Sequence, residues 1–165
     1  MKNLKSIFFV FLLLIGITFT SCNKEVEKTA DKKVTWNQED EKLVTAAISD
    51  YVEGLYLVDS SRIEKSVDST LRKIGYWYNP DEKAYRDNLP MTYTQLLNLA
   101  ASWNKFGNRT SETSPKEIEI YDVNTKTASA KLTAEWGVDY FHLSKVNDQW
   151  RIVNVIWQSM LKIDK

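Results

Sequence analysis

Several residue types are scarce in this sequence of 165 residues, and each scarcity excludes a kind of site. A single cysteine, Cys22, cannot form an internal disulfide. A single histidine, His142, and the absence of clustered acidic ligands leave no metal site with the usual spacing. The sequence also contains no glycine-rich phosphate loop and no Gly-x-Ser-x-Gly nucleophile elbow. We therefore predict neither a metal nor a cofactor.

Neither sign of charge dominates, and the apolar run near the start is short. The chain has 22 basic and 22 acidic side chains, a balance that argues against a nucleic-acid-binding surface. The apolar run, Ile7 to Phe19, is shorter than the ~20 residues of a membrane-spanning helix. Only three prolines and five glycines interrupt the chain, whereas six Trp, eight Tyr and six Phe are present. This composition predicts one well-packed domain with aromatic side chains available for a pocket or an interface.

The first 21 residues have the layout of a secretory signal. Lys2 and Lys5 form a basic start, the apolar run follows, and small residues precede Cys22. The segment Phe-Thr-Ser-Cys, residues 19–22, resembles the bacterial lipobox, in which the cysteine is acylated and becomes the new N-terminus. The resemblance implies a lipid-anchored protein of the bacterial cell envelope, and Asn-Lys-Glu after the cysteine implies the outer membrane. The alternative is a secreted protein that is cleaved nearby, with Cys22 incidental.

Residues 22–37 are charged and poor in apolar residues, which predicts a flexible tether before a domain at 38–165. In that domain, apolar residues at three- and four-residue steps predict a helix over 39–58, and Asp59 is suited to cap a short second helix. Thr92 and Gln95 have the spacing of a capping box before a third helix. Strand-like runs are 71–78, 84–86, 117–123, 127–146 and 149–161. Helices followed by an antiparallel meander predict an α+β fold.

The last hairpin predicts two faces. If Asn147-Asp148 is a two-residue turn, Val146 pairs with Gln149, and side chains alternate from there. The face toward the helices would then combine Asp139 and Phe141 with Trp150, Ile152, Asn154, Ile156 and Gln158. The opposite face would combine Tyr140 and His142 with Val153, Val155 and Trp157. Because both faces are mainly apolar, we predict a small-molecule pocket on the first and a homodimer interface on the second.

Two segments resemble a known family. The helix Ile-Ser-Asp-Tyr-Val-Glu-Gly-Leu-Tyr at 48–56, followed by Asp59, is similar to the opening helix of the putative lumazine-binding family. The closing segments 139–143 and 148–154 strengthen the resemblance, which covers roughly residues 40–160. That family belongs to the nuclear transport factor 2-like superfamily, together with polyketide cyclases and ketosteroid isomerase. The resemblance implies a cone, in which a strongly curved antiparallel sheet wraps around N-terminal helices, with a cavity at its wide end and dimerisation through the outer face.

Six residues are candidates for the pocket. Three lie on predicted helices and three on the last hairpin: Tyr51, Tyr56, Trp103, Asp139, Phe141 and Asn154. Asp139 could act as a catalytic base if it were desolvated, because burial raises the pKa of a carboxylate. His142 lies three residues away, and an odd spacing on a strand places the two side chains on opposite faces. We therefore expect His142 to be structural or part of an interface.

Three functions remain open at the level of sequence. The first is a lipid-anchored, non-catalytic module that binds a small apolar or aromatic ligand. The second is an enzyme of the isomerase or cyclase type, with Asp139 as base and a tyrosine such as Tyr56 polarising a carbonyl. The third is a structural interaction module without a working pocket. The absence of a recognisable catalytic set favours the first.

Overall fold

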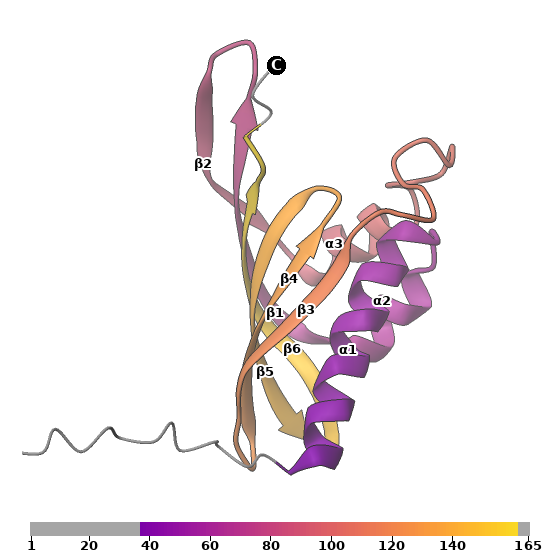
Figure 1. Cartoon of the computed structure of the whole chain (residues 1–165), viewed down its shortest axis with the longest axis vertical. Helices are drawn as coiled ribbons and strands as arrows, with labels where there is room; N and C mark the ends of the chain where they lie inside the picture. The colour runs from indigo at the N-terminus through magenta and orange to yellow at the C-terminus, as the bar shows by residue number, and fades with distance from the viewer. Residues whose placement is uncertain (1–36, 162–165) are drawn as a thin grey trace, which may run out of the picture. The chain divides into compact units, whose positions relative to one another are not determined.

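The structure, a computed structural model, describes residues 37–161. The predicted signal, Cys22 and almost all of the predicted tether lie outside this range. The described residues form three helices and six strands (Figure 1): α1 Gln38–Tyr56, α2 Ser60–Ser66, β1 Val67–Asn79, β2 Ala84–Met91, α3 Tyr93–Ala100, β3 Lys116–Val123, β4 Thr127–Ala134, β5 Gly137–Val146 and β6 Gln149–Ser159. The predicted α+β class is confirmed. Among these residues, no helix has the length and apolar character needed to cross a membrane.

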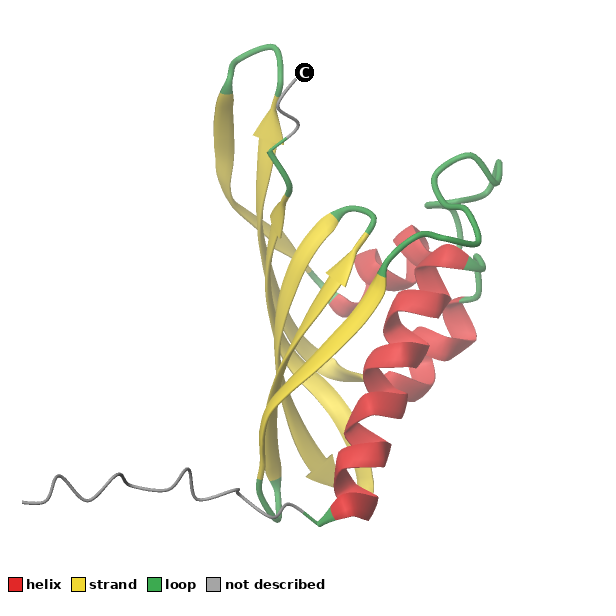
Figure 2. Cartoon of the chain, in the orientation of Figure 1, coloured by secondary structure: helices red, strands yellow, loops and turns green. Residues whose placement is uncertain are grey.

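All six strands belong to one curved, unclosed sheet in the order β2-β1-β6-β5-β4-β3, and the helices cover one of its faces (Figure 2). Four neighbouring pairs are antiparallel, but β1 and β6 are parallel. The predicted antiparallel meander is present as β3–β4–β5–β6, whereas the parallel β1–β6 pair departs from the antiparallel sheet that the resemblance implies. Short turns predict antiparallel neighbours, whereas β1 and β6 lie at opposite ends of the domain sequence and no turn joins them.

The helices begin where their caps predict. The side chain of Asn37 accepts a hydrogen bond from the backbone of Glu39 at the start of α1, and Asp59 caps α2 in the same way. Thr92 and Gln95 form the predicted capping box of α3. The apolar face of α1 is buried against the sheet: Val44, Ile48, Tyr51, Val52 and Leu55. Burial of such side chains is the main stabilising contribution to a fold of this size.

The run 127–146 is two strands rather than one. The chain turns at Glu135-Trp136, and Ala134 pairs with Gly137 across a two-residue loop. Gly137 has a φ of 140°, which side chains rarely allow, and a Cβ there would lie 2.1 Å from the carbonyl oxygen of Gln158. This glycine was the available sequence signal for the turn. Trp136 thus lies at the tip of a hairpin, beside the helices.

The predicted register of the last hairpin holds from Val146 to Leu143 and then fails. A bulge in β6 shifts the pairing, so that Phe141 lies opposite Val155 rather than Asn154. Because side chains alternate, a slip of one residue exchanges the two faces of the strand. Val155 is therefore fully buried, and Ile156 is 47% exposed on the outer face.

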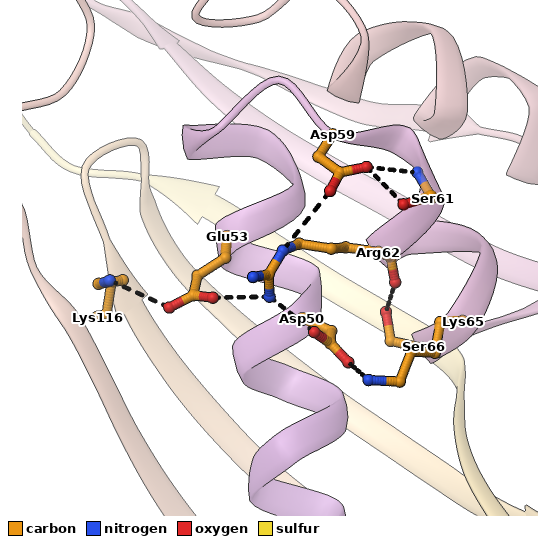
Figure 3. Close-up of polar contacts among 8 residues, drawn as sticks. All are labelled: Asp50, Glu53, Asp59, Ser61, Arg62, Lys65, Ser66 and Lys116. Atoms are coloured by element: carbon orange, nitrogen blue, oxygen red, sulfur yellow. Dashed lines mark hydrogen bonds and ion pairs between the residues drawn. The ribbon is translucent and has the colours of Figure 1, made fainter.

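Charged side chains join α1 to α2 and to β3 (Figure 3). Arg62 of α2 contacts Asp50 at 2.8 Å and Glu53 at 2.7 Å, both on α1. Lys65 reaches the other oxygen of Asp50 at 2.6 Å, and Lys116 reaches Glu53 at 3.3 Å. We call these five side chains the helix network. It holds the short helix α2, which has little apolar surface of its own, against α1.

Candidate functional site

A cleft of about 550 Å³ opens at one end of the sheet. Four segments meet there: the β1–β2 hairpin, the connection after α3, the β4–β5 turn and the end of β6. Its lining is rich in aromatic residues: Trp77, Tyr78, Pro80, Trp103, Asn108, Arg109, Glu135, Trp136, Trp157, Ser159 and Met160. The volume lies within the range of small-molecule sites in proteins.

Three tryptophans of the cleft, Trp103, Trp136 and Trp157, also line a smaller chamber of about 80 Å³. The remaining walls of the chamber come from both helices and sheet: Tyr51, Leu55, Lys73, Met91 and Leu99. Trp103 and Trp136 meet edge to face, with their ring centroids 5.3 Å apart. Cleft and chamber therefore share one aromatic wall, and we call the two together the tryptophan cavity.

A buried ion pair lies at the base of the tryptophan cavity. Lys73 of β1 approaches Asp139 of β5, with Nζ 2.9 Å from Oδ1. The lysine side chain is 5% exposed and the aspartate side chain is fully buried. The same ammonium donates to the Tyr51 hydroxyl at 2.8 Å, and that hydroxyl lies 3.4 Å from Asp139 Oδ1. A charge this deep is tolerated because it is paired and hydrogen-bonded.

Both carboxylate oxygens of Asp139 are occupied. Oδ1 accepts from Lys73 and Tyr51, and Oδ2 accepts from the indole N–H of Trp136. Burial, reinforced by the negative charge of Asp139, raises the pKa of Tyr51 well above its usual value, so this phenol stays protonated. Burial also lowers the pKa of Lys73, against the opposing effect of Asp139. Three donors of the protein therefore engage the carboxylate of Asp139.

Trp157 packs directly over Gly75, its neighbour in the parallel β1–β6 pair. A Cβ at position 75 would lie 2.0 Å from the Trp157 Nε1 atom, so only glycine leaves room for the indole. The ring of Trp157 lies 5.4 Å from the Lys73 ammonium, within cation–π range. Its N–H is buried and has no hydrogen-bond acceptor among residues 37–161.

The structure brings most of the predicted pocket residues together. Tyr51 and Trp103 line the chamber, and Asp139 lies behind its base. Phe141 packs edge to face on the Tyr51 ring at 5.1 Å, outside the chamber wall. Tyr56 stacks on Trp103 at 5.9 Å and supports that ring from behind. Its hydroxyl donates to the Pro115 carbonyl at 2.7 Å and accepts from the Glu135 backbone at 2.8 Å.

Asn154 does not belong to the pocket. The bulge places it opposite His142, and its amide donates to the Arg72 carbonyl at 3.2 Å along the outer part of the sheet. His142 itself is exposed, whereas Asp139 is buried, so the two side chains point to opposite faces as predicted. No dyad can form between them.

Many lining residues of the cavity were not predicted, and three of them carry the shared wall and the ion pair: Lys73, Trp136 and Trp157. Lys73 alternates with Leu71 and Gly75 on the buried face of β1, so its position in the predicted strand was the available signal. The register error had placed Trp157 on the outer face, and the missed turn had placed Trp136 within a strand. The described residues bring together no group of three His, Cys, Asp or Glu side chains that could hold a metal ion.

Comparison with solved structures agrees with the fold. The chain is similar to an NTF2-like protein of unknown function from Silicibacter pomeroyi, at 15% identity and a TM-score of 0.56 over 76% of this chain and 100% of that one. It is similar to an NTF2-like protein of unknown function from Shewanella baltica, at 20% identity and a TM-score of 0.54 over 76% and 98% of the two chains. A third, an NTF2-like protein with a cystatin-like fold from Novosphingobium aromaticivorans, has 11% identity and a TM-score of 0.51 over 76% and 85%. These identities establish a shared fold alone.

Sequence comparison gives the family. No curated protein matches the chain. The family described as "Putative lumazine-binding" matches residues 39–158. The match runs from α1 to β6 and leaves out only the first residue of α1 and the last residue of β6. The match covers more than two thirds of the 165 residues. The chain belongs to the "Putative lumazine-binding" family, with an NTF2-like fold.

Proposed function

We propose that this domain binds a small apolar or aromatic ligand in the tryptophan cavity and does not transform it. The observation that carries the proposal is the shared wall of Trp103, Trp136 and Trp157 between an open cleft and a smaller chamber. Aromatic faces of this kind stack on flat ligands, and the cleft supplies the volume for one ring system. Among the described residues, the chamber has only two lining residues with polar side-chain groups besides the tryptophans, Tyr51 and Lys73. The cleft also carries Asn108, Arg109, Glu135 and Ser159. Mainly aromatic walls with a few polar groups are usual in small-molecule sites.

The engagement of Asp139 supports binding without catalysis. A general base must reach the proton that it removes. Asp139 holds Lys73, Tyr51 and Trp136 with its two oxygens and is absent from the chamber lining. The Tyr56 hydroxyl, the other group of the isomerase hypothesis, is held by backbone atoms behind Trp103. Asp139 and Tyr56, the two groups of the isomerase hypothesis, therefore both stabilise the walls of the cavity.

A neutral dye tests the binding proposal. N-phenyl-1-naphthylamine fluoresces in apolar surroundings, and we expect it to bind the chain from residue 23 onward with a stoichiometry of one. Leu99→Trp fills the chamber and should weaken this binding by about tenfold or more, since about 1.4 kcal/mol corresponds to a factor of ten. Phe106→Trp is the matched control, because Phe106 is 87% exposed and lies outside both linings. Equal affinities in the two variants would contradict the proposal, and no dye binding at all would favour an interaction module.

We propose further that the domain is attached to the cell envelope, at the outer membrane, by lipid on Cys22. Support comes from the signal-like residues 1–21 and the lipobox-like residues 19–22. One acyl chain binds a bilayer weakly and two or more hold stably, so multiple acylation would keep the protein at the membrane. In cells fed an alkyne fatty acid, the wild type should take up label and fractionate with membranes, and Cys22→Ser should do neither. Unlabelled wild-type protein would refute the anchor.

We also propose a homodimer through the outer face of the sheet. Tyr140 and Ile156 are neighbours in the β5–β6 pair and are 49% and 47% exposed, and Ile74, half-buried, extends the patch on β1. Exposed apolar side chains on adjacent strands are typical of an interface. Light scattering during size-exclusion of a chain without residues 1–22 should give a dimer mass, and Ile156→Lys should give a monomer. A monomeric wild type at micromolar concentration would count against the interface.

A further inference from the structure

We infer that the tryptophan cavity selects neutral ligands that carry a carbonyl oxygen, and that Lys73 binds this oxygen at the base of the chamber. The inference rests on the proposed function, because it specifies what kind of molecule the same cavity takes. It depends on three properties of the base: the number of donors that Lys73 has left, the charge balance around it, and the size of the chamber.

The ammonium of Lys73 has a donor to spare. It carries three N–H groups, and the described residues offer it two acceptors, Tyr51 Oη at 2.8 Å and Asp139 Oδ1 at 2.9 Å. Beyond these it meets the ring faces of Tyr51 and Trp157, with centroids at 5.5 and 5.4 Å. A cation–π contact attracts the charge but is weaker than a hydrogen bond to a charged donor in a dry site. A ligand oxygen in the chamber would therefore accept a hydrogen bond from the third N–H of Lys73 and stabilise the buried ammonium.

Charge balance decides which oxygen fits. Lys73 and Asp139 together are neutral, and the ion pairs of residues 37–161 give Asp139 no second cation. A carboxylate in the chamber would leave one net negative charge buried, which is costly in a medium of low dielectric constant. A ketone or amide oxygen accepts the same hydrogen bond and keeps the base neutral. The site therefore discriminates by charge as well as by hydrogen bonding.

A second donor on the same wall has no partner. The Trp157 N–H is buried without an acceptor among the described residues, although such groups are nearly always paired. Trp157 lines the chamber, but its Nε1 atom is the one packed over Gly75. We therefore assign the hydrogen bond to the ligand oxygen to Lys73 alone.

The chamber size fixes how such a ligand enters. A volume of about 80 Å³ holds a few heavy atoms, since a water molecule occupies about 30 Å³ in the liquid. A carbonyl group with its attached carbon fits, and the ring that bears it remains between the tryptophans in the cleft. Arg109 lies over Trp103 at 5.5 Å on the cleft side, so any charged substituent belongs at the mouth.

Three naphthalenes of one shape test the inference. 2-Acetylnaphthalene carries a ketone, 2-isopropenylnaphthalene replaces the oxygen by CH₂, and 2-naphthoate carries a carboxylate. We expect calorimetry with the wild type to rank the ketone first, at least about tenfold tighter than the alkene, because a hydrogen bond to a charged donor is worth that much or more. The carboxylate should bind more weakly than the ketone by a similar factor.

A variant with both charges removed assigns the preference to the ion pair. Lys73→Met with Asp139→Asn keeps the base neutral, and the carbonyl oxygen of the new amide can still accept a hydrogen bond from Tyr51 or Trp136. Ketone and alkene should then bind within about threefold of each other. Lys145→Met is the matched control, because it breaks an ion pair with Asp40 away from the cavity and should keep the full preference.

The outcomes separate this inference from the proposed function. If the dye and all three naphthalenes fail to bind, the cavity is no binding site and both fall. If the dye binds and ketone and alkene bind equally, the cavity stands and the role of Lys73 is overturned. Tighter binding of 2-naphthoate would overturn the charge argument. If the double variant does not fold, the ranking on the wild type alone decides.

Discussion

Two ion pairs of almost the same length have different consequences in this domain. Lys73 and Asp139 are 2.9 Å apart at the base of the tryptophan cavity, and Arg62 and Asp50 are 2.8 Å apart in the helix network. The side chains of the first pair are 5% and 0% exposed, and those of the second are 33% and 11% exposed. Distance alone therefore does not distinguish a site from a structural contact.

The surroundings make the difference. In the helix network Arg62 contacts Glu53 as well as Asp50, and water can reach what these partners leave open. At the cavity base both side chains are almost completely buried, and the rings of Tyr51 and Trp157 flank the Lys73 ammonium. A break in the first pair can be repaired by solvent, whereas a break in the second leaves a bare buried charge.

Removing the cation of the buried pair should therefore have the largest effect. Lys73→Met leaves Asp139 charged and without its ion-pair partner, and we expect the free energy of unfolding to fall by roughly 3 to 5 kcal/mol. Urea denaturation at pH 7 measures it. Lys73→Met combined with Asp139→Asn should recover most of the loss, because no buried charge remains. A double variant as unstable as the single one would show that packing, and not charge, explains the effect.

Substituting the glycine beneath Trp157 tests the cavity wall rather than its charge. In Gly75→Ala the new methyl overlaps the indole, whose Nε1 lies 2.0 Å from the Cβ position, so Trp157 must move. We expect a loss of roughly 1 to 3 kcal/mol, as for other overpacked sites, together with weaker dye binding. Trp157→Phe should reduce the cost of Gly75→Ala, because the smaller ring leaves room. Additive losses in the double variant would contradict direct contact.

The sequence predicted what depends on neighbours in the chain. The bounds of α1 were expected at 39–58 and lie at 38–56, and the caps at Asp59 and Thr92 are present, because these features depend on spacings of three or four residues. The family resemblance added the curved sheet, which local patterns do not determine. Tyr51, Trp103 and Asp139 were placed near the cavity on this combined basis.

The rest of the site depends on contacts that no local pattern determines. Trp157 faces the cavity because of the bulge in β6 between Ile152 and Asn154, and a bulge exchanges faces without changing composition. Lys73 faces inward because it lies beside the buried Val155 of β6 and on the same face of β1 as Leu71 and Gly75. A lysine in an amphipathic strand is ordinarily assigned to the solvent face despite its alternation with Leu71 and Gly75, and Asp139, the partner that stabilises its burial, is distant in the sequence.

Breaking the Arg62–Asp50 pair of the helix network should cost less than either change at the cavity. Arg62→Met removes the contacts with Asp50 and Glu53, and we expect a loss of about 1 kcal/mol because solvent screens the carboxylates that remain. Urea denaturation measures the loss, and Arg62→Lys should recover part of it. Dye affinity should stay unchanged, since no residue of the network lines the chamber. A loss as large as that of Lys73→Met would remove the distinction between the two pairs.

Asp40 and Lys145 form a third ion pair, whose burial lies between that of the other two. The pH dependence of stability measures its contribution. Its carboxylate accepts from Lys145 at 2.7 Å and from the Trp150 indole at 2.9 Å, which joins the start of α1 to the last hairpin. The Lys145 hydrogen bond, followed by that of Trp150, lowers the pKa of Asp40 below its ordinary value of 3.8. The unfolded chain therefore binds the proton first as pH falls, so the stabilisation is present above about pH 4 and is lost below it.

Asp40→Asn should therefore cost stability at pH 7 and cost progressively less below about pH 4, where the wild type loses the same contribution. Although this pair is more buried, the change should be smaller than that of Arg62→Met, because Asn keeps an oxygen that can accept from Trp150, whereas Arg62→Met removes the cation of several ion pairs. Lys145→Met should flatten the acid limb of the stability curve in the same way, because it removes the cation that lowers the pKa. Urea midpoints from acid to neutral pH measure this. If the penalty of Asp40→Asn stayed constant with pH, Asp40 would act by hydrogen bonding to Trp150 alone. The charge of its pair with Lys145 would then contribute nothing, unlike the charges of the Lys73–Asp139 and Arg62–Asp50 pairs. If instead the stability penalty of Asp40→Asn fades in acid, the charge of the Asp40–Lys145 pair contributes to stability. If ketone binding at the cavity persists under the same conditions, the charge of Lys73 contributes to ligand recognition.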